Sequence, residues 1–360
     1  MLINVYCRSR PWLHTQLEAN VKTAKHAILF AIILVLLIPA WADEKTPLKL
    51  VQATPLPELH DGDFDHFAVD LQGNRLFSTA EENSKVLVFD LKSNKLIHTI
   101  EGLKAPHSMV YRADLKKLFV VDGDSGDVRM YETGSYKPAG TIKVREGADS
   151  STYDPMSKYL YIVDTGKDAH LPDSYITIVD TTSAKKVGEI KINSDDVEAI
   201  TLEKSGPRLF VDIRGKGEVQ VYDRNRHALL ATWPLGEVAK KPTTIALDEP
   251  DHRLFVGTRD PGKLVVLDTD SGKVVTSYAA ASMSDDMVYS PAQKRIYFAG
   301  SEFVDVFEQR DSNHYEKIGH VPTAFRAKTA ILVPELNRYY VAVPHHENQS
   351  AELRVYEVVK

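Results

Sequence analysis

One pattern recurs seven times along this chain and constrains its fold more than any other feature. A polar or basic residue followed by two large apolar residues opens an apolar segment every 40 to 49 residues. The copies are Arg75-Leu76-Phe77, Lys117-Leu118-Phe119, Tyr159-Leu160-Tyr161, Arg208-Leu209-Phe210, Arg253-Leu254-Phe255, Arg295-Ile296-Tyr297 and Arg338-Tyr339-Tyr340. A second marker, an acid that ends a later strand, recurs at Asp90, Glu132, Asp180, Asp223, Asp268, Glu308 and Glu357. Repeats of this length indicate one supersecondary unit per copy.

The repeated unit has the character of a small β-sheet. Its apolar segments, such as 86–89 and 264–267, have the length and period of β-strands, and no helical period persists along the chain. Four short strands in a unit of about 43 residues are typical of a β-propeller blade. A solenoid of β-hairpins is the alternative.

The ends of the repeat distinguish these two architectures, because a closed ring joins its ends whereas a solenoid caps them. The seventh copy stops at Lys360 after its third strand, and the segment 48–53 precedes the first copy without a partner of its own. We therefore predict an all-β fold, a seven-bladed β-propeller over residues 43–360 as a single domain. Its last blade is expected to be closed by the N-terminal strand, about residues 48–53.

The turn after the third strand carries a resemblance to a known family. Asp, two residues, Ser and a Lys two positions later occur at 90–95, 180–185 and 268–273. Together with the repeat markers, these turns resemble the YVTN-type seven-bladed propeller repeats of bacterial exported proteins. The resemblance implies a propeller and an extracytoplasmic setting, and it implies no single activity.

The N-terminal segment predicts export. Arg8, Arg10, Lys22 and Lys25 precede the uninterrupted apolar run 27–38, and Ala40 and Ala42 follow it. This order is typical of a signal peptide, here residues 1–42, cleaved before Asp43. An uncleaved N-terminal anchor is the alternative. We expect a periplasmic or secreted protein with no stable membrane insertion after cleavage.

Charge and cysteine content narrow the classes of partner and chemistry. The chain has 44 basic and 50 acidic side chains, and removal of residues 1–42 leaves 40 against 49. A net acidic domain disfavours nucleic acid and anionic membranes as partners unless it has a compensating basic patch, and the sequence shows no such cluster. Because the only cysteine is Cys7, the mature domain has no disulfide and no thiolate chemistry. We expect a monomer.

Polar residues recur about 11 positions before the repeat marker, where each blade begins. In a propeller these segments and the loops between second and third strands lie on one face, so the residues are expected to ring the mouth of the central channel. They are Asp65, His66, His107, Asp149, Glu198, Thr243, Asp285, Asp286 and Lys328. The long loop 164–174 is expected to overhang this mouth.

Three interpretations of the ring remain open. His66 and His107, with Asp149, Glu198 or Asp285, could hold a divalent metal ion, the only cofactor that the sequence suggests. Asp65, Asp149, Thr243, Asp285 and Asp286 could bind a small polar ligand directly. A water-filled channel lined by charge is the third interpretation.

The sequence accordingly supports more than one function. The first is a binding or scaffold protein that holds a small molecule, a metal ion or a protein partner at the mouth. The alternative is a lactonase or lactonising enzyme, with His107 as general base, Glu198 as its partner and Lys328 stabilising an oxyanion. A redox-associated propeller is a lower alternative. No nucleophile turn of the Gly-x-Ser-x-Gly type and no His-Glu-x-x-His pattern occurs.

Overall fold

The computed structural model describes residues 46–360 as 28 β-strands in seven four-stranded antiparallel sheets. The predicted signal peptide, residues 1–42, lies outside the described residues. In residues 46–360, no helix has the length and apolar character needed to cross a bilayer.

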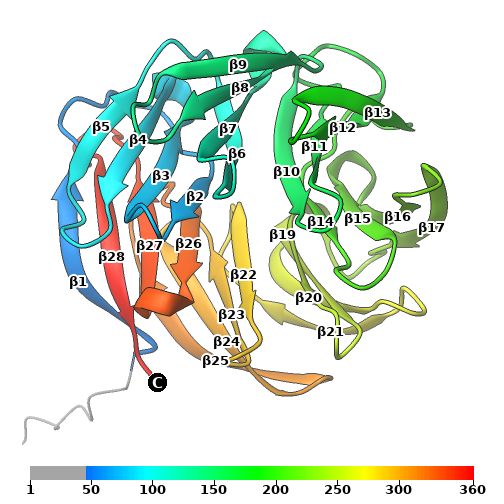
Figure 1. Cartoon of the computed structure of the whole chain (residues 1–360). Coiled ribbons are helices and arrows are strands. Elements are labelled where there is room, and N and C mark those ends of the chain that lie inside the picture. Colours follow the sequence, from blue (N-terminus) through cyan, green and yellow to red (C-terminus); the bar gives the residue numbers. More distant parts are fainter. Residues whose placement is uncertain (1–45) are drawn as a thin grey trace, which may run out of the picture. The chain divides into compact units, whose positions relative to one another are not determined.

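Each sheet is one blade of a ring (Figure 1). The strands are, blade by blade, β2 (Phe67–Asp70), β3 (Arg75–Ala80), β4 (Lys85–Asp90) and β5 (Leu96–Ile100); β6 (Pro106–Arg112), β7 (Lys117–Asp122), β8 (Asp127–Glu132) and β9 (Pro138–Lys143); β10 (Ala148–Asp154), β11 (Tyr159–Asp164), β12 (Ser174–Asp180) and β13 (Lys185–Ile192); β14 (Ile200–Leu202), β15 (Arg208–Ile213), β16 (Glu218–Asp223) and β17 (Ala228–Pro234); β18 (Lys240–Asp248), β19 (Arg253–Asp260), β20 (Gly262–Asp268) and β21 (Val274–Ala279); β22 (Asp286–Ser290), β23 (Arg295–Ala299), β24 (Phe303–Asp311) and β25 (His314–Pro322); β26 (Thr329–Val333), β27 (Arg338–Val343), β28 (Glu352–Val358) and β1 (Leu48–Pro55). Three 3-10 turns, η1 (Glu81–Asn83), η2 (Gly123–Ser125) and η3 (Arg214–Lys216), connect second to third strands, and a fourth, η4 (Pro334–Leu336), connects the first strand of the seventh blade to its second.

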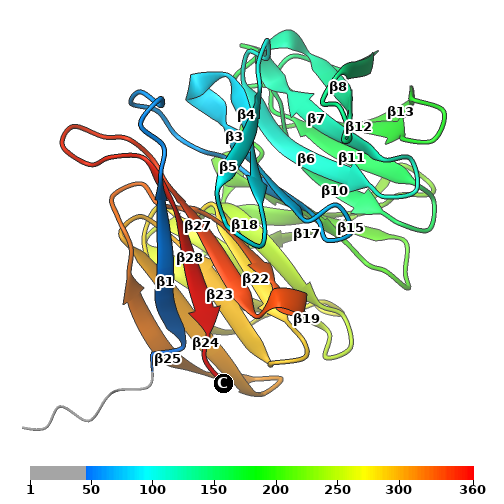
Figure 2. The same cartoon turned by 60° about the vertical axis from the view of Figure 1, so that its left-hand side comes forward.

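The first strands of neighbouring blades contact one another all the way around the ring, β26 and β2 included. The ring is therefore closed, and the predicted seven-bladed β-propeller is confirmed. The seventh blade has the order β1-β28-β27-β26, with Leu48 opposite Val358. Figures 1 and 2 both show β1, in blue, beside β28, in red. The predicted closing strand runs two residues further than expected, to Pro55.

The repeat marker recurs because its two apolar residues point to opposite faces of the second strand. Leu76 packs between blades seven and one, whereas Phe77 packs between blades one and two. The other six pairs alternate in the same way, so that seven apolar clusters, one between each pair of adjacent blades, form the core. Burial of both faces of a strand explains the continuous apolar runs in the sequence.

The acids after the third strands form turns, as in the motif that resembles YVTN repeats. Asp90 accepts hydrogen bonds from the backbone N–H and the hydroxyl of Ser93, at 2.8 Å each. The sixth blade differs from the prediction, because β24 continues past Glu308 to Asp311. A bulge between Gln309 and Asp311 lets β24 pair with a longer β25.

Candidate functional site

A cavity of about 220 Å³, lined almost entirely by polar side chains, lies at the mouth of the channel, where the first strands of the blades begin. The first blade contributes two predicted residues to it, and each of the other six blades contributes one. The eight are Asp65, His66, His107, Asp149, Glu198, Thr243, Asp285 and Lys328. Asp286 instead lines the channel beneath the mouth, with Met109, Ile200 and Met287. The structure thus brings together the residues that the repeat placed at the start of each blade.

Five further residues line the same cavity and were not predicted. They are Glu81, Ser150, Asp168, Arg214 and Arg259. Glu81, Arg214 and Arg259 each follow the first residue of a repeat marker by six positions, at the end of the second strand or in the turn after it. The repeat therefore contained a signal for these three charges. Asp168 belongs to the loop predicted to overhang the mouth.

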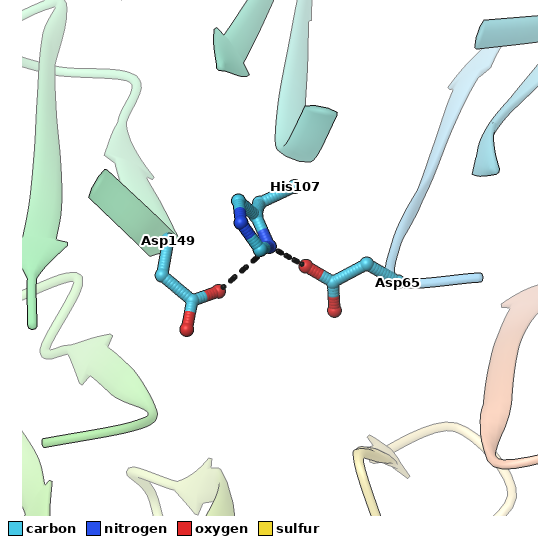
Figure 3. A group of neighbouring side chains, drawn as sticks. All are labelled: Asp65, His107 and Asp149. Carbon is cyan, nitrogen blue, oxygen red and sulfur yellow. Dashed lines mark hydrogen bonds and ion pairs between the residues drawn. The ribbon is translucent and has the colours of Figure 1, made fainter. Parts of the chain in front are cut away.

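His107 is the centre of a compact group that also contains Asp65 and Asp149 (Figure 3). His107 Nδ1 donates a hydrogen bond to Asp65 Oδ2 at 2.7 Å and lies 3.5 Å from Asp149 Oδ1. On the other side of the ring, His107 Nε2 lies 4.0 Å from Glu81 Oε1. The three side chains of the group come from three successive blades, so the arrangement depends on the packing of blades one, two and three against one another.

His66 extends this group toward the channel. Its Nδ1 lies 3.0 Å from Asp286 Oδ1 and its Nε2 lies 3.5 Å from Asp65 Oδ1. Asp65 therefore sits between two imidazoles, and Asp286, His66, Asp65 and His107 alternate in charge from the channel to the mouth. Such an alternating chain satisfies each buried charge with an opposite neighbour.

Burial and the neighbouring charges shift the protonation of this group. Burial opposes the charged form of His107, but Asp149 and Asp65 outweigh it and raise the pKa of His107 to about 10. Burial raises the pKa of Glu81 to about 8 and that of Asp149 to about 6. The two imidazolium neighbours, acting against burial, hold the pKa of Asp65 below its usual range. At neutral pH, His107 is therefore an imidazolium and Glu81 a neutral acid.

Cations of the later blades occupy the other side of the mouth, and each is already paired. Arg214 forms an ion pair with Glu198. Arg259 Nη2 lies 2.6 Å from Asp285 Oδ1, and Lys328 Nζ lies 2.7 Å from Asp285 Oδ2. These contacts use the carboxylates of Glu198 and Asp285, so neither acid is free to act with the group around His107.

The predicted metal ligands accordingly separate into two sets. His107 and Asp149 lie together, and Asp65 completes their group. Glu198 and Asp285 are paired with cations. The hydroxyl of Thr243 donates to the carbonyl of Ser284 at 3.1 Å, which is a structural contact.

The structure pairs the residues of the predicted catalytic arrangement differently from the prediction. The sequence suggests Glu198 as the partner of His107, whereas the structure pairs His107 with Asp65 and Glu198 with Arg214. The physical reason is the ring itself, because Glu198 enters two blades away from His107, while Asp65 enters from the adjacent blade. A histidine with a pKa of about 10 is also protonated at neutral pH, the wrong state for a general base.

Comparisons with known proteins identify the fold. No protein-family model matches the chain, and no curated protein matches it. Among solved structures, 1608 chains match, so the fold is too widely shared to indicate an activity.

Three of these structures illustrate the likeness. A chain in the crystal structure of the mitotic checkpoint complex matches with a TM-score of 0.72 and 14% identity, over 99% of this chain and 100% of that one. A chain of Kuenenia stuttgartiensis hydrazine synthase gives 0.67 and 15%, over 82% and 96%. The structure of U3-55K gives 0.68 and 13%, over 86% and 98%. At these identities the likeness shows the fold alone: the protein is a seven-bladed β-propeller.

Proposed function

We propose that this protein binds a divalent metal ion at the mouth of its channel. The observation that carries the proposal is the group of Asp65, His107 and Asp149, whose potential ligand atoms all lie within 4.8 Å of one another. An ion among them would take the place of the proton on His107 Nδ1, which now lies between the two carboxylates.

The mouth is rich in groups that can bind a cation. Six carboxyl groups line the cavity, with three permanent cations and two imidazoles. With Glu81 neutral and both imidazoles protonated, the positive and negative charges nearly balance, so an ion that displaces the proton of His107 would replace one positive charge with another. One imidazole and two carboxylates suit zinc, manganese or iron.

The setting that we propose for this activity is outside the cytoplasm. Its support is the basic segment, apolar run and small residues of 1–42, and the turn motif that resembles YVTN-type repeats of exported proteins. An exported chain would begin at Asp43, which mass spectrometry of the protein recovered from the periplasm or medium tests. Recovery of the protein only from the cytoplasm, with residues 1–42 intact, would contradict this setting.

The metal proposal is tested by elemental analysis of the full chain, expressed in a bacterial host supplied in turn with zinc, manganese and iron. We expect one equivalent of one of these metals in the wild type and none in the Asp65→Asn/Asp149→Asn double variant. Asp168→Asn is the matched control, since Asp168 is an exposed carboxyl of the same mouth outside the group. Metal-free wild-type protein under all three conditions, or equal metal in the double variant, would overturn the proposal.

A further inference from the structure

A second cavity, of about 480 Å³, lies beside the mouth, next to the fourth and fifth blades. Its walls come from η3, from the connection between β17 and β18, and from the start of β18. Its charged lining residues are Asp196, Arg214, Lys216, Lys240 and Lys241. Arg214 lines both this cavity and the mouth, so the two are neighbours.

The charge of this cavity is opposite to that of the mouth. Four cationic side chains, Arg214, Lys216, Lys240 and Lys241, line it, against the single carboxylate of Asp196. The whole chain has a formal net charge of −6. A concentration of positive charge within a net acidic protein is a local feature that the overall composition does not explain.

The one carboxylate in the cavity is already neutralised. Arg214 Nε donates to Asp196 Oδ1 at 2.7 Å, and Lys167 Nζ lies 3.9 Å from the same oxygen. By contrast, no carboxylate of residues 46–360 lies within 4.0 Å of the ammonium groups of Lys216 or Lys240; every described ion pair of the region involves other residues. Lys241 Nζ lies 3.6 Å from Asp260 Oδ2, but both side chains are largely exposed, so this ion pair is weak.

Three of the residues that line the cavity are glycines, which have no side chain to fill it. A Cβ at Gly215 would lie 2.9 Å from Asp196 Cβ, so a side chain there would displace the acid. Gly217 and Gly236 have φ values of +65° and +60°, a conformation that favours glycine. A Cβ on Gly236 would meet no atom within 4 Å, and one on Gly217 would meet only Lys240 Cα at 4.0 Å, so the space beside these two glycines is open.

We propose that this cavity binds a small oxyanion, a phosphate or carboxylate group, through Lys216 and Lys240, with Arg214 at its inner edge. Lysine ammonium groups bind such anions as point charges. The guanidinium of Arg214 is held by Asp196 and Glu198, so it marks the inner edge of the cavity and the two lysines supply the contacts to the anion. The site takes a ligand of the opposite charge to the metal proposed for the mouth, so it neither requires nor excludes that metal.

The test is calorimetric titration of the full chain with inorganic phosphate and, separately, with malonate, at low ionic strength. We expect binding of at least one of the two anions, and the one that binds identifies the anionic group. In the Lys216→Gln/Lys240→Gln variant, we expect the affinity to fall by roughly tenfold or more, because two charge-assisted contacts are lost.

The matched control is Lys92→Gln/Lys273→Gln, which removes the same charge from two exposed lysines in turns after third strands. The control should bind as the wild type does, and chloride at the same ionic strength should produce no binding heat. If neither anion binds, or if the Lys216→Gln/Lys240→Gln variant binds as tightly as the control, the anion site does not exist. Because phosphate and malonate are titrated into metal-free protein, failure of the metal proposal would leave this result unchanged.

Discussion

At the scale of single residues, His107 can occupy its position because the residue facing it has no side chain. In blades one, four and five, the position six residues after the start of the marker holds Glu81, Arg214 and Arg259. In blade two the same position is Gly123. A Cβ on Gly123 would lie 2.8 Å from His107 Cδ2 and 2.6 Å from the carbonyl oxygen of Ala148. A methyl group on residue 123 would therefore displace the imidazole of His107.

Gly123→Ala is expected to destabilise the protein by about 1–3 kcal/mol, as overpacking usually does, and to weaken metal binding by displacing His107. Gly134→Ala in the same blade is the control, because a Cβ there meets no atom within 4 Å. Urea unfolding and metal titration of both variants measure the effect. If the two variants have equal stability and equal metal affinity, a methyl group on residue 123 does not displace His107.

A second residue-scale feature is the carboxyl group of Asp212, which is fully buried in β15. Neither of its oxygens has a hydrogen-bond partner among the described residues, and burial raises its pKa well above 3.8. The folded protein therefore keeps this proton over a pH range in which the unfolded chain has lost it. Stability must fall as the pH rises through that range, by up to about 1.4 kcal/mol per pH unit.

Asp212→Asn removes this penalty, so the variant should gain stability over the wild type progressively between pH 5 and pH 8. Thermal unfolding across that range measures the difference. Asp195→Asn, at an exposed position, is the control and should show no such trend. A constant difference between Asp212→Asn and the wild type would mean that Asp212 is ionised in the folded protein.

At the scale of elements, β1 is the strand on which closure of the ring depends. Leu48 is 2% exposed and packs in the cluster between blades six and seven, whereas Leu50 of the same strand is 49% exposed. Leu48→Ala should therefore cost about 2–5 kcal/mol of unfolding free energy, and Leu50→Ala less than about 0.5 kcal/mol. Denaturant unfolding of both variants gives the comparison. Similar losses in the two variants would show that β1 is held by its backbone pairing with β28 alone.

The elements of the fold could be predicted from the sequence because each second strand is buried on both faces. The pairs such as Leu76 and Phe77 must be large and apolar in every blade, so the period is visible without any structure. The end of β24 was predicted wrongly because it depends on a bulge in its pairing with β25. Bulges leave no periodic mark in a sequence.

The site could be predicted only in part, for the same physical reason. Position in the repeat determines which residues reach the mouth, and that position can be counted. Which side chains pair with one another depends on which blades are adjacent and on side-chain rotation. The position in the repeat contains neither, so the pairing of His107 with Asp65 could not be predicted from it. Glu81 and Arg214 were missed although they occupy an equivalent position, because the count was made only for the first strands.

At the scale of the whole molecule, the proposed metal would join three blades. Asp65, His107 and Asp149 belong to blades one, two and three, so an ion held by all three opposes their separation. At a free metal concentration 100 times the dissociation constant, binding to the folded state alone adds about 2.7 kcal/mol of stability. Calorimetric melting with metal and with a chelator measures this gain. The same melting temperature in both, for a protein shown to bind the metal, would mean that the ion also binds the unfolded chain.

The pairing of β1 with β28 also governs the order of events during synthesis. A ribosome makes β1 before any blade and β28 after all others, so the two cannot meet until nearly the whole chain has been released. Until then β1 offers unpaired backbone groups and the side chain of Leu48 to any strand within reach, including those of another nascent copy. The rate of chain synthesis, rather than the stability of any single strand pair, therefore sets the time during which β1 can pair with a wrong strand.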